Sequence, residues 1–197
     1  MGTEDYFEDY LKKISIFKSK IHFLPILLHM RKPREICFNA EYHVTAKINR
    51  GEFALESREV KNLFLSVVSR SKKTHSFRLR HFVVMSNHIH FLIKPGEDES
   101  LSRIMQWILG VFAVYYNKQF NLNGHVWQDR FKSKVIKSYR QLIATFKYIC
   151  NNPVKAEMVE TPIEYRYGGL WFIRNREFEL IEPPDPFLLI LLPELFR

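Results

Sequence analysis

The sequence has few cysteines and no long apolar run. Cys37 and Cys150 are the two cysteines among 197 residues, which argues against a disulfide scaffold and favours a reducing compartment. No apolar run reaches the roughly 18 residues that a membrane-spanning helix needs. Glu4 and Asp5 stand near the N-terminus, where a signal peptide needs positive charge. We therefore expect a soluble, cytoplasmic protein without a membrane partner.

Acidic residues are scarce in the middle of the chain. Residues 61–140 hold 14 Lys and Arg against 4 Asp and Glu, a net charge of +10, whereas the whole chain sums to +9. A basic block of this kind favours a polyanionic partner, most simply nucleic acid, although a solvated surface gives the same composition. Because apolar residues make up 46% of the chain, it can bury a core, which excludes a disordered basic tail protein.

Hydrophobic periodicity predicts an α+β domain. Runs rich in β-branched and aromatic residues predict strands over residues 42–48, 82–85, 88–93 and 134–136. Apolar stripes at helical spacing predict helices over residues 56–73, 100–120 and 138–152. On these stripes Tyr115 and Tyr139 are expected in the core. The order of the elements implies an antiparallel sheet with helices on one face.

Two histidines lie on one predicted strand. Alternate residues of a strand share a face, so His88 and His90 point one way while Ile89 and Phe91 point into the core. Two imidazoles on one sheet face can bind a divalent metal, for which imidazole chemistry alone favours zinc, and a third ligand is needed. Two partly exposed histidines on a solvated face are the alternative interpretation.

The predicted helix after Ser138 has two different faces. At about 100° per residue its apolar residues gather on one side, and Tyr148 falls roughly opposite them. Asn152 follows one turn later and lies near Tyr148, because residues four apart are neighbours on a helix. One face of this helix is therefore expected to be packed and the other to carry Tyr148 and Asn152, whereas the plainer interpretation is an exposed surface tyrosine.

Aromatic and basic residues alternate just before this helix. Such a set can stack on unpaired bases and hold phosphates. Alternatively, the aromatic members belong to the core and the lysines are solvated. The candidate DNA-binding residues are Trp127, Arg130, Phe131, Lys132, Lys134 and Lys137.

Three blocks of sequence, in order, resemble a known family. Residues 85–93, MSNHIHFLI, resemble the His-hydrophobe-His (HUH) motif of single-tyrosine transposases. Residues 124–133, GHVWQDRFKS, and residues 148–156, YICNNPVKA, narrow the resemblance to REP-associated tyrosine transposases of the IS200-like group. The resemblance covers residues 31–170, and three blocks together are far more specific than two histidines alone.

The resemblance implies a fold, a cofactor and an activity. The implied fold is a ferredoxin-like (RRM-like) antiparallel sheet, and the implied cofactor is Mg²⁺ or Mn²⁺ held by His88, His90 and Asn152. The implied nucleophile is Tyr148, which cleaves single-stranded DNA at hairpin or palindromic elements and transfers the strand through a 5′-phosphotyrosine intermediate. Relatives often form homodimers. A phenol is a weak nucleophile at neutral pH, so the site must activate it.

The resemblance also divides the chain and leaves alternatives. We expect an N-terminal extension over residues 1–30, a catalytic domain over 31–170 and an apolar C-terminal tail over 171–197, which docks on the domain or on a second subunit. The alternative function is a catalytically retired DNA-hairpin-binding protein, a repressor or host factor. A nucleotide hydrolase of the histidine-triad type needs a further alternate histidine, and Leu92 stands at that position.

Overall fold

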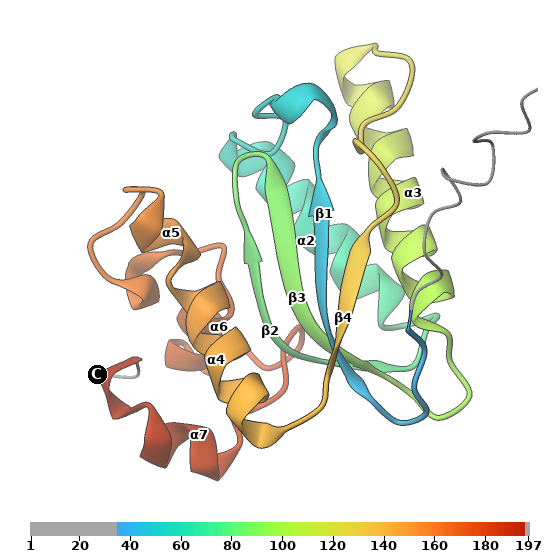
Figure 1. Cartoon of the computed structure of the whole chain (residues 1–197). Helices are drawn as coiled ribbons and strands as arrows, with labels where there is room; N and C mark the ends of the chain where they lie inside the picture. The colour runs from blue at the N-terminus through green and yellow to red at the C-terminus, as the bar shows by residue number, and fades with distance from the viewer. Residues whose placement is uncertain (1–34, 196–197) are drawn as a thin grey trace, which may run out of the picture. The chain divides into compact units, whose positions relative to one another are not determined.

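The computed structural model describes residues 35–195 (Figure 1). The expected N-terminal extension, residues 1–30, lies outside the described residues. Four strands form one antiparallel sheet: β1 (Glu41–Lys47), β2 (Phe77–Val84), β3 (His88–Pro95) and β4 (Lys132–Ile136). Its helices are α2 (Arg58–Ser71), α3 (Leu101–Phe120), α4 (Tyr139–Cys150), α5 (Asn152–Lys155), α6 (Gly169–Arg174) and α7 (Pro186–Leu191). Short 3₁₀ turns cover Asn49–Gly51, Pro162–Glu164 and Pro193–Leu195.

The topology confirms the predicted fold class. The strands lie in the order β2-β3-β1-β4, and the chain visits them with α2 between β1 and β2 and α3 between β3 and β4. This is the ferredoxin-like arrangement, with β1 paired to β3 on one side and to β4 on the other. In this register Thr45 lies opposite His90, and Lys47 lies opposite His88.

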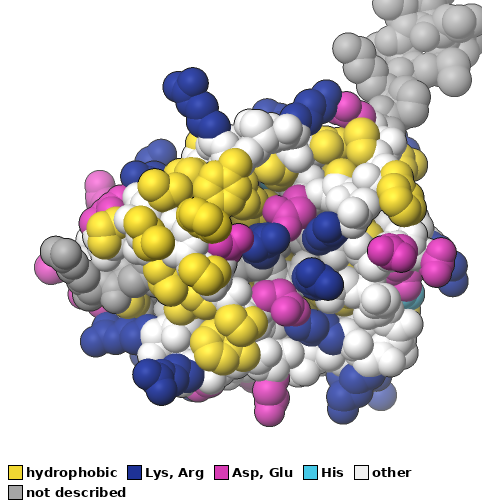
Figure 2. Space-filling model, turned by 90° about the horizontal axis from the view of Figure 1, so that it is seen from below, with side chains coloured by type: hydrophobic (Ala, Val, Ile, Leu, Met, Phe, Trp, Pro, Cys, Tyr) yellow, Lys and Arg dark blue, Asp and Glu magenta, His cyan; other side chains and the backbone are white. Residues whose placement is uncertain are grey.

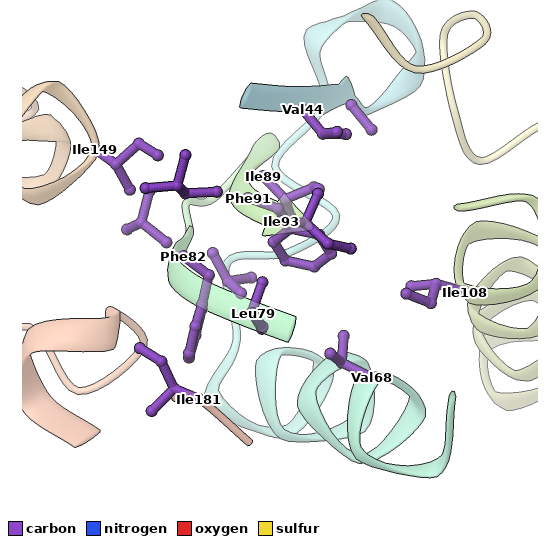
Figure 3. Packing of buried hydrophobic residues seen from close by; sticks show 14 of the residues in the cluster. Val44, Val68, Leu79, Phe82, Ile89, Phe91, Ile93, Ile108, Ile149 and Ile181 are labelled. Atoms are coloured by element: carbon purple, nitrogen blue, oxygen red, sulfur yellow. The ribbon is translucent and has the colours of Figure 1, made fainter. Parts of the chain in front are cut away.

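One face of the sheet is packed with apolar side chains against α2 and α3. The α2 helix begins at the N-cap Ser57, whose side chain accepts a hydrogen bond from the Val60 amide at 3.2 Å. Its Phe64 contacts Phe91 of β3 and Phe112 of α3, with ring centroids 6.1 and 5.2 Å apart. Figure 3 shows Phe91 and its strand neighbours pointing toward Val68 of α2 and Ile108 of α3. This face holds most of the hydrophobic core.

The α4 helix lies against the opposite face of the sheet. Its capping residue Ser138 accepts from the Gln141 amide at 3.2 Å, as the capping pattern predicts. Phe146 is buried and stacks on His81 of β2, with ring centroids 4.3 Å apart. The sequence predicted helices on one face, which α2 and α3 cover. The α4 helix takes the other face because its own apolar stripe also needs burial.

The C-terminal residues are divided between core and surface. Leu188, Leu192 and Leu195 are buried in the main hydrophobic cluster, so the tail docks on the domain. In contrast, Phe187 and Ile190 of α7 are 64% and 70% exposed, and hydrophobic side chains gather on this face of the molecule (Figure 2). Among residues 35–195, no helix is long and apolar enough to cross a bilayer.

The prediction that Tyr115 and Tyr139 lie in the core is wrong. Tyr139 is the first residue of α4 and only its ring edge meets Phe187, at a centroid distance of 6.4 Å. Tyr115 lies in the second half of α3, where its hydroxyl accepts from Arg70 Nη1 at 2.9 Å. Tyr115 is 38% exposed and Tyr139 is 41% exposed, so neither belongs to the core.

Candidate active site

A groove lies between α4 and the sheet face that α4 covers. Its volume is about 800 Å³. One wall comes from α4, whose groove-facing residues are spaced three and four apart and so share one face of the helix. The floor comes from alternate residues of β1 and β4 and from the start of β3. The lining residues are His43, Thr45, Lys47, His88, His90, Lys132, Ser133, Lys134, Ile136, Gln141, Ala144, Thr145, Tyr148 and Asn152.

The strand register brings three histidines together in this groove. His88 and His90 share a face of β3, as predicted, and their ring centroids are 5.0 Å apart. His43 comes from β1, and its ring stacks on His90 with centroids also 5.0 Å apart. The His90 Nδ1 atom lies 2.9 Å from His43 Nε2 and 3.0 Å from Thr45 Oγ1, both at hydrogen-bond distance. His88 Nδ1 donates to Asn87 Oδ1 at 2.7 Å.

Burial keeps these imidazoles neutral. It lowers the pKa of His90 to about 3, with further lowering from the nearby His88, His43 and Lys47. Burial also lowers the pKa of His88, an effect that a hydrogen bond with Asn152 partly offsets. The pKa of His43 is lowered by burial and then by the charge of Lys134. A neutral imidazole has a free lone pair, which is the form that binds a metal.

Tyr148 lies above the histidines, on the side of α4 that faces the groove. Its side chain is 43% exposed, and its ring meets His90 edge-on at 5.3 Å and His43 at 5.8 Å between centroids. Lys155 Nζ lies 5.5 Å from the centre of the Tyr148 ring. Asn152 Nδ2 donates to the Tyr148 carbonyl at 2.7 Å, so Asn152 lies beside Tyr148 as the helical spacing predicted.

The residues present fit a divalent metal at one end of the groove. The Asn152 side chain lies close enough to the His88 imidazole to raise its pKa, and both residues line the groove. The Nδ2 of Asn152 is engaged with the backbone, which leaves the amide oxygen as a hard ligand, and His88 and His90 supply neutral nitrogens. Residues 35–195 contain no group of three or more His, Cys, Asp and Glu that could hold a metal. The candidate set therefore depends on the amide of Asn152.

The rim of the groove is positively charged. Lys47, Lys132 and Lys134 line it, and no Asp or Glu is among its lining residues in the described part of the chain. Lys132 and Lys134 lie on β4 opposite Thr45 and His43, so alternation along two strands places their side chains on the face of the histidines. A polyanion that enters the groove meets these ammonium groups first.

The other candidate DNA-binding residues lie elsewhere. Phe131 is buried, and the Trp127 ring packs 5.5 Å from Phe112 while its Nε1 donates to the Leu109 carbonyl at 2.9 Å. These two aromatic residues therefore serve the packing, which was the alternative interpretation. Arg130 is exposed outside the groove, and Lys137 forms an ion pair of 2.6 Å with Glu35.

His43 and Thr45 were missed by the sequence analysis. They alternate with the buried Val44 and Ala46 along β1, so the signal was a polar side chain at every second position of a predicted strand. This pattern places both on the face of the sheet opposite the core. It does not reveal that His90, more than 40 residues away in the chain, is their neighbour.

The fold and the groove together define an α+β domain with an exposed phenol above paired imidazoles and a cationic rim. The family model described as "Transposase IS200 like" matches residues 36–152, which is more than half of the chain. The chain belongs to this family, whose members are enzymes that act on DNA. The matched segment ends at Asn152 and so includes His88, His90 and Tyr148.

Two individual relatives, one curated and one of known structure, agree with this assignment. A Haemophilus influenzae protein assigned as a REP-associated tyrosine transposase is 28% identical over 134 residues, which span 63% of this chain and 74% of the relative. A solved REP-associated tyrosine transposase bound to a REP hairpin superposes with a TM-score of 0.64 at 20% identity, covering 74% of this chain and 86% of its own. A 98-residue stretch is 30% identical to the Gallus gallus E3 ubiquitin-protein ligase BRE1A; it spans half of this chain and only 9% of that protein.

Proposed function

We propose that this protein cleaves and rejoins single-stranded DNA with the Tyr148 hydroxyl as nucleophile and a divalent metal as cofactor. The observation that carries the proposal is the position of Tyr148. Its exposed phenol stands at ring-contact distance from His90, inside a groove whose rim is lined by lysines. A surface tyrosine without a function does not require this combination.

The reaction transfers a phosphoryl group without oxidation or reduction. The Tyr148 oxygen forms a bond to the scissile phosphorus while the bond from phosphorus to the 3′ oxygen breaks. The phenol loses its proton and the leaving 3′ oxygen gains one. The product is a 5′-phosphotyrosine, which keeps the phosphodiester energy, so a second 3′ hydroxyl can reverse the step and join a strand.

Other residues of the groove orient the substrate. Lys132 and Lys134 hold backbone phosphates, and the Lys155 ammonium beside the Tyr148 ring places positive charge near the nucleophile. When bound by His88, His90 and Asn152, a divalent ion such as Mg²⁺ or Mn²⁺ supplies stabilisation of the charge that develops on the phosphate. Arg130 and Lys137 lie outside the groove and are candidates for contacts with flanking DNA.

The proposed substrate is a DNA hairpin with a single-stranded flank. The solved relative of similar fold is bound to a REP hairpin, and that observation belongs to the relative. For this chain it selects the probe: single strands that fold into imperfect palindromes. Homodimer formation and a cytoplasmic location remain predictions, the first of which light scattering of the full chain tests.

The test is a search for covalent protein–DNA adducts. We would incubate the full chain with a library of DNA hairpins and Mn²⁺ and separate the products on a denaturing gel. Tyr148→Phe is expected to abolish the adduct. Tyr139→Phe is the matched control, because Tyr139 is an exposed tyrosine of the same helix that lies outside the groove, and it is expected to leave the adduct unchanged.

Two outcomes distinguish the alternatives. Loss of the adduct on chelation of the metal supports the proposal in full. Tight hairpin binding without any adduct, in Mg²⁺ and in Mn²⁺, overturns it and supports the catalytically retired repressor or host factor.

A further inference from the structure

His43 is a residue of the groove to which no sequence motif pointed. It lies on β1, opposite Lys134 of β4 and Leu92 of β3, and its side chain shares a face with Thr45. Its ring lies nearly parallel to that of His90, with an interplanar angle of 29°, and meets Tyr148 edge-on. It therefore touches both a candidate metal ligand and the proposed nucleophile.

The contacts at His90 are unequal between its two ring nitrogens. Nδ1 has two partners, His43 Nε2 at 2.9 Å and Thr45 Oγ1 at 3.0 Å. The neighbouring ligand shows the same division, because His88 Nδ1 donates to Asn87 Oδ1. In a neutral imidazole one nitrogen carries the proton and the other carries the lone pair. A partner that accepts at Nδ1 therefore leaves the lone pair on Nε2.

We propose that His43 is a positioning residue that accepts the Nδ1 proton of His90 and so fixes the His90 ring and tautomer with Nε2 available to the metal. This inference rests on the proposed function for its metal, but the tautomer itself is a property of the chain. Ligating histidines commonly donate their second ring nitrogen to a fixed acceptor, and loss of that acceptor costs about 10- to 100-fold in metal affinity.

Thr45 alone cannot do the same. A hydroxyl both donates and accepts, so Thr45 is compatible with either tautomer of His90. It also holds only one point of the ring, whereas the larger His43 ring, inclined by 29° to that of His90, restricts the plane of the ring as well. His43 therefore restricts the orientation of the ring and, when its own proton is on Nδ1, presents Nε2 as an acceptor to His90; Thr45 supplies a second partner at His90 Nδ1.

The first measurement is the tautomer of His90 in metal-free protein. We would label the full chain with ¹⁵N, treat it with a chelator and record long-range proton–nitrogen correlations of the histidine rings. The wild type is expected to carry the His90 proton on Nδ1. His43→Leu is expected to shift His90 toward the Nε2-protonated form, and His43→Gln, which keeps an acceptor oxygen, is expected to restore the wild-type spectrum.

The second measurement is Mn²⁺ binding, followed by the electron paramagnetic resonance of the free ion. We expect His43→Leu to weaken binding by about 10- to 100-fold and His43→Gln to weaken it much less. His125→Leu is the matched control, since His125 is an exposed histidine outside the groove. Amide spectra of each variant establish that it is folded.

The outcomes separate this inference from the proposed function. If the wild type has its His90 proton on Nε2, or if His43→Leu leaves both the tautomer and the affinity unchanged, His43 is not a positioning residue. If the wild type has the expected tautomer but binds no Mn²⁺ in the presence or absence of hairpin DNA, the metal site of the proposed function fails while the role of His43 in fixing the ring stands.

Discussion

The two faces of the sheet are built from the same strands but behave differently. On the face toward α2 and α3, Val44 and Phe91 are fully buried among apolar neighbours. On the face toward α4, their chain neighbours His43 and His90 line an open groove. Alternation along the strand lets one segment supply core and site together. The core face holds the strands in register, and that register sets the distances between the groove residues.

Two buried histidines on the groove face, His90 and His81, differ in their surroundings. His90 meets two polar partners and the groove, whereas His81 is enclosed by Phe146, Cys150 and the start of α6. His81 Nε2 lies 3.1 Å from Cys150 Sγ, and its Nδ1 is buried with no hydrogen-bond partner among residues 35–195. Both have a pKa of about 3, which burial causes. A low pKa therefore does not distinguish the site histidine from the packed one, whereas its neighbours do.

The largest expected effect comes from breaking the core face. Phe91→Ala removes a fully buried ring that contacts Phe64, and it should lower the free energy of unfolding by about 3–5 kcal/mol. His90→Ala, one residue earlier, should cost much less because it opens onto the groove. Denaturant unfolding of the two variants measures the difference. Equal losses of unfolding free energy would contradict the conclusion that the core face supplies stability and the groove face supplies the site.

Substitutions on the groove face should reduce activity rather than the free energy of unfolding. His88→Ala removes a proposed metal ligand and is expected to reduce adduct formation by about 100-fold or more, because the charge on the phosphate loses its stabilisation. His88 is only partly buried, so the unfolding midpoint of the His88→Ala variant should stay close to that of the wild type. Adduct yield over a Mn²⁺ series is the measurement. Normal yield at every metal concentration would remove His88 from the site.

These comparisons also explain how far the sequence could lead. Periodicity along β1, β3 and α4 located the elements, the shared face of His88 and His90, and the exposed side of Tyr148. Each of these depends on neighbours in the chain. The approach of His43 to His90 depends on the pairing of β1 with β3, and local periodicity does not specify a partner strand.

Tyr139 and Trp127 show the opposite limitation. Both predictions rested on local patterns, the stripe of a helix and a run of alternating aromatic and basic residues. Whether such a side chain is covered depends on what packs over it. Tyr139 is exposed and meets the Phe187 ring at an edge contact, whereas Trp127 packs against Phe64 and Phe112.

The pH dependence of stability should reveal the packed histidine. The pKa of His81 is about 3 in the folded protein, against about 6.5 in an unfolded chain, so the unfolded state binds the proton first. Stability should therefore fall as the pH drops below about 6.5, by about 2 kcal/mol between pH 7 and pH 5 for this group. His81→Gln should flatten this slope in urea unfolding, and the exposed His125→Gln should not. An unchanged slope in His81→Gln would show that His81 binds its proton equally in the folded and unfolded states.

The close packing around His81 can also be tested at its neighbour Gly169. A Cβ at Gly169, the first residue of α6, would lie 2.4 Å from His81 Nδ1 and 2.7 Å from Ile181 Cδ1. Gly169→Ala should therefore cost about 1–3 kcal/mol of unfolding free energy through overpacking. Gly110→Ala is the matched control. Its Cβ would meet nothing within 4 Å among the described residues in the exposed middle of α3, so it should stabilise by about 0.5–1 kcal/mol. Equal effects would mean that the contact with His81 relaxes without cost.

The smallest expected effect concerns the charged rim of the groove. Lys132→Gln and Lys134→Gln each remove one ammonium group from the face of the histidines, so each should weaken hairpin binding similarly for all sequences. If each lysine neutralises one phosphate, the slope of log affinity against log salt should fall by about 1 per variant. Lys118→Gln, on α3 and outside the groove, should leave the slope unchanged. Fluorescence anisotropy with labelled hairpins at several salt concentrations measures it. A slope that responds to Lys118 but not to the β4 lysines would place the DNA on the core-side helices, and the groove would lose its role as the binding face.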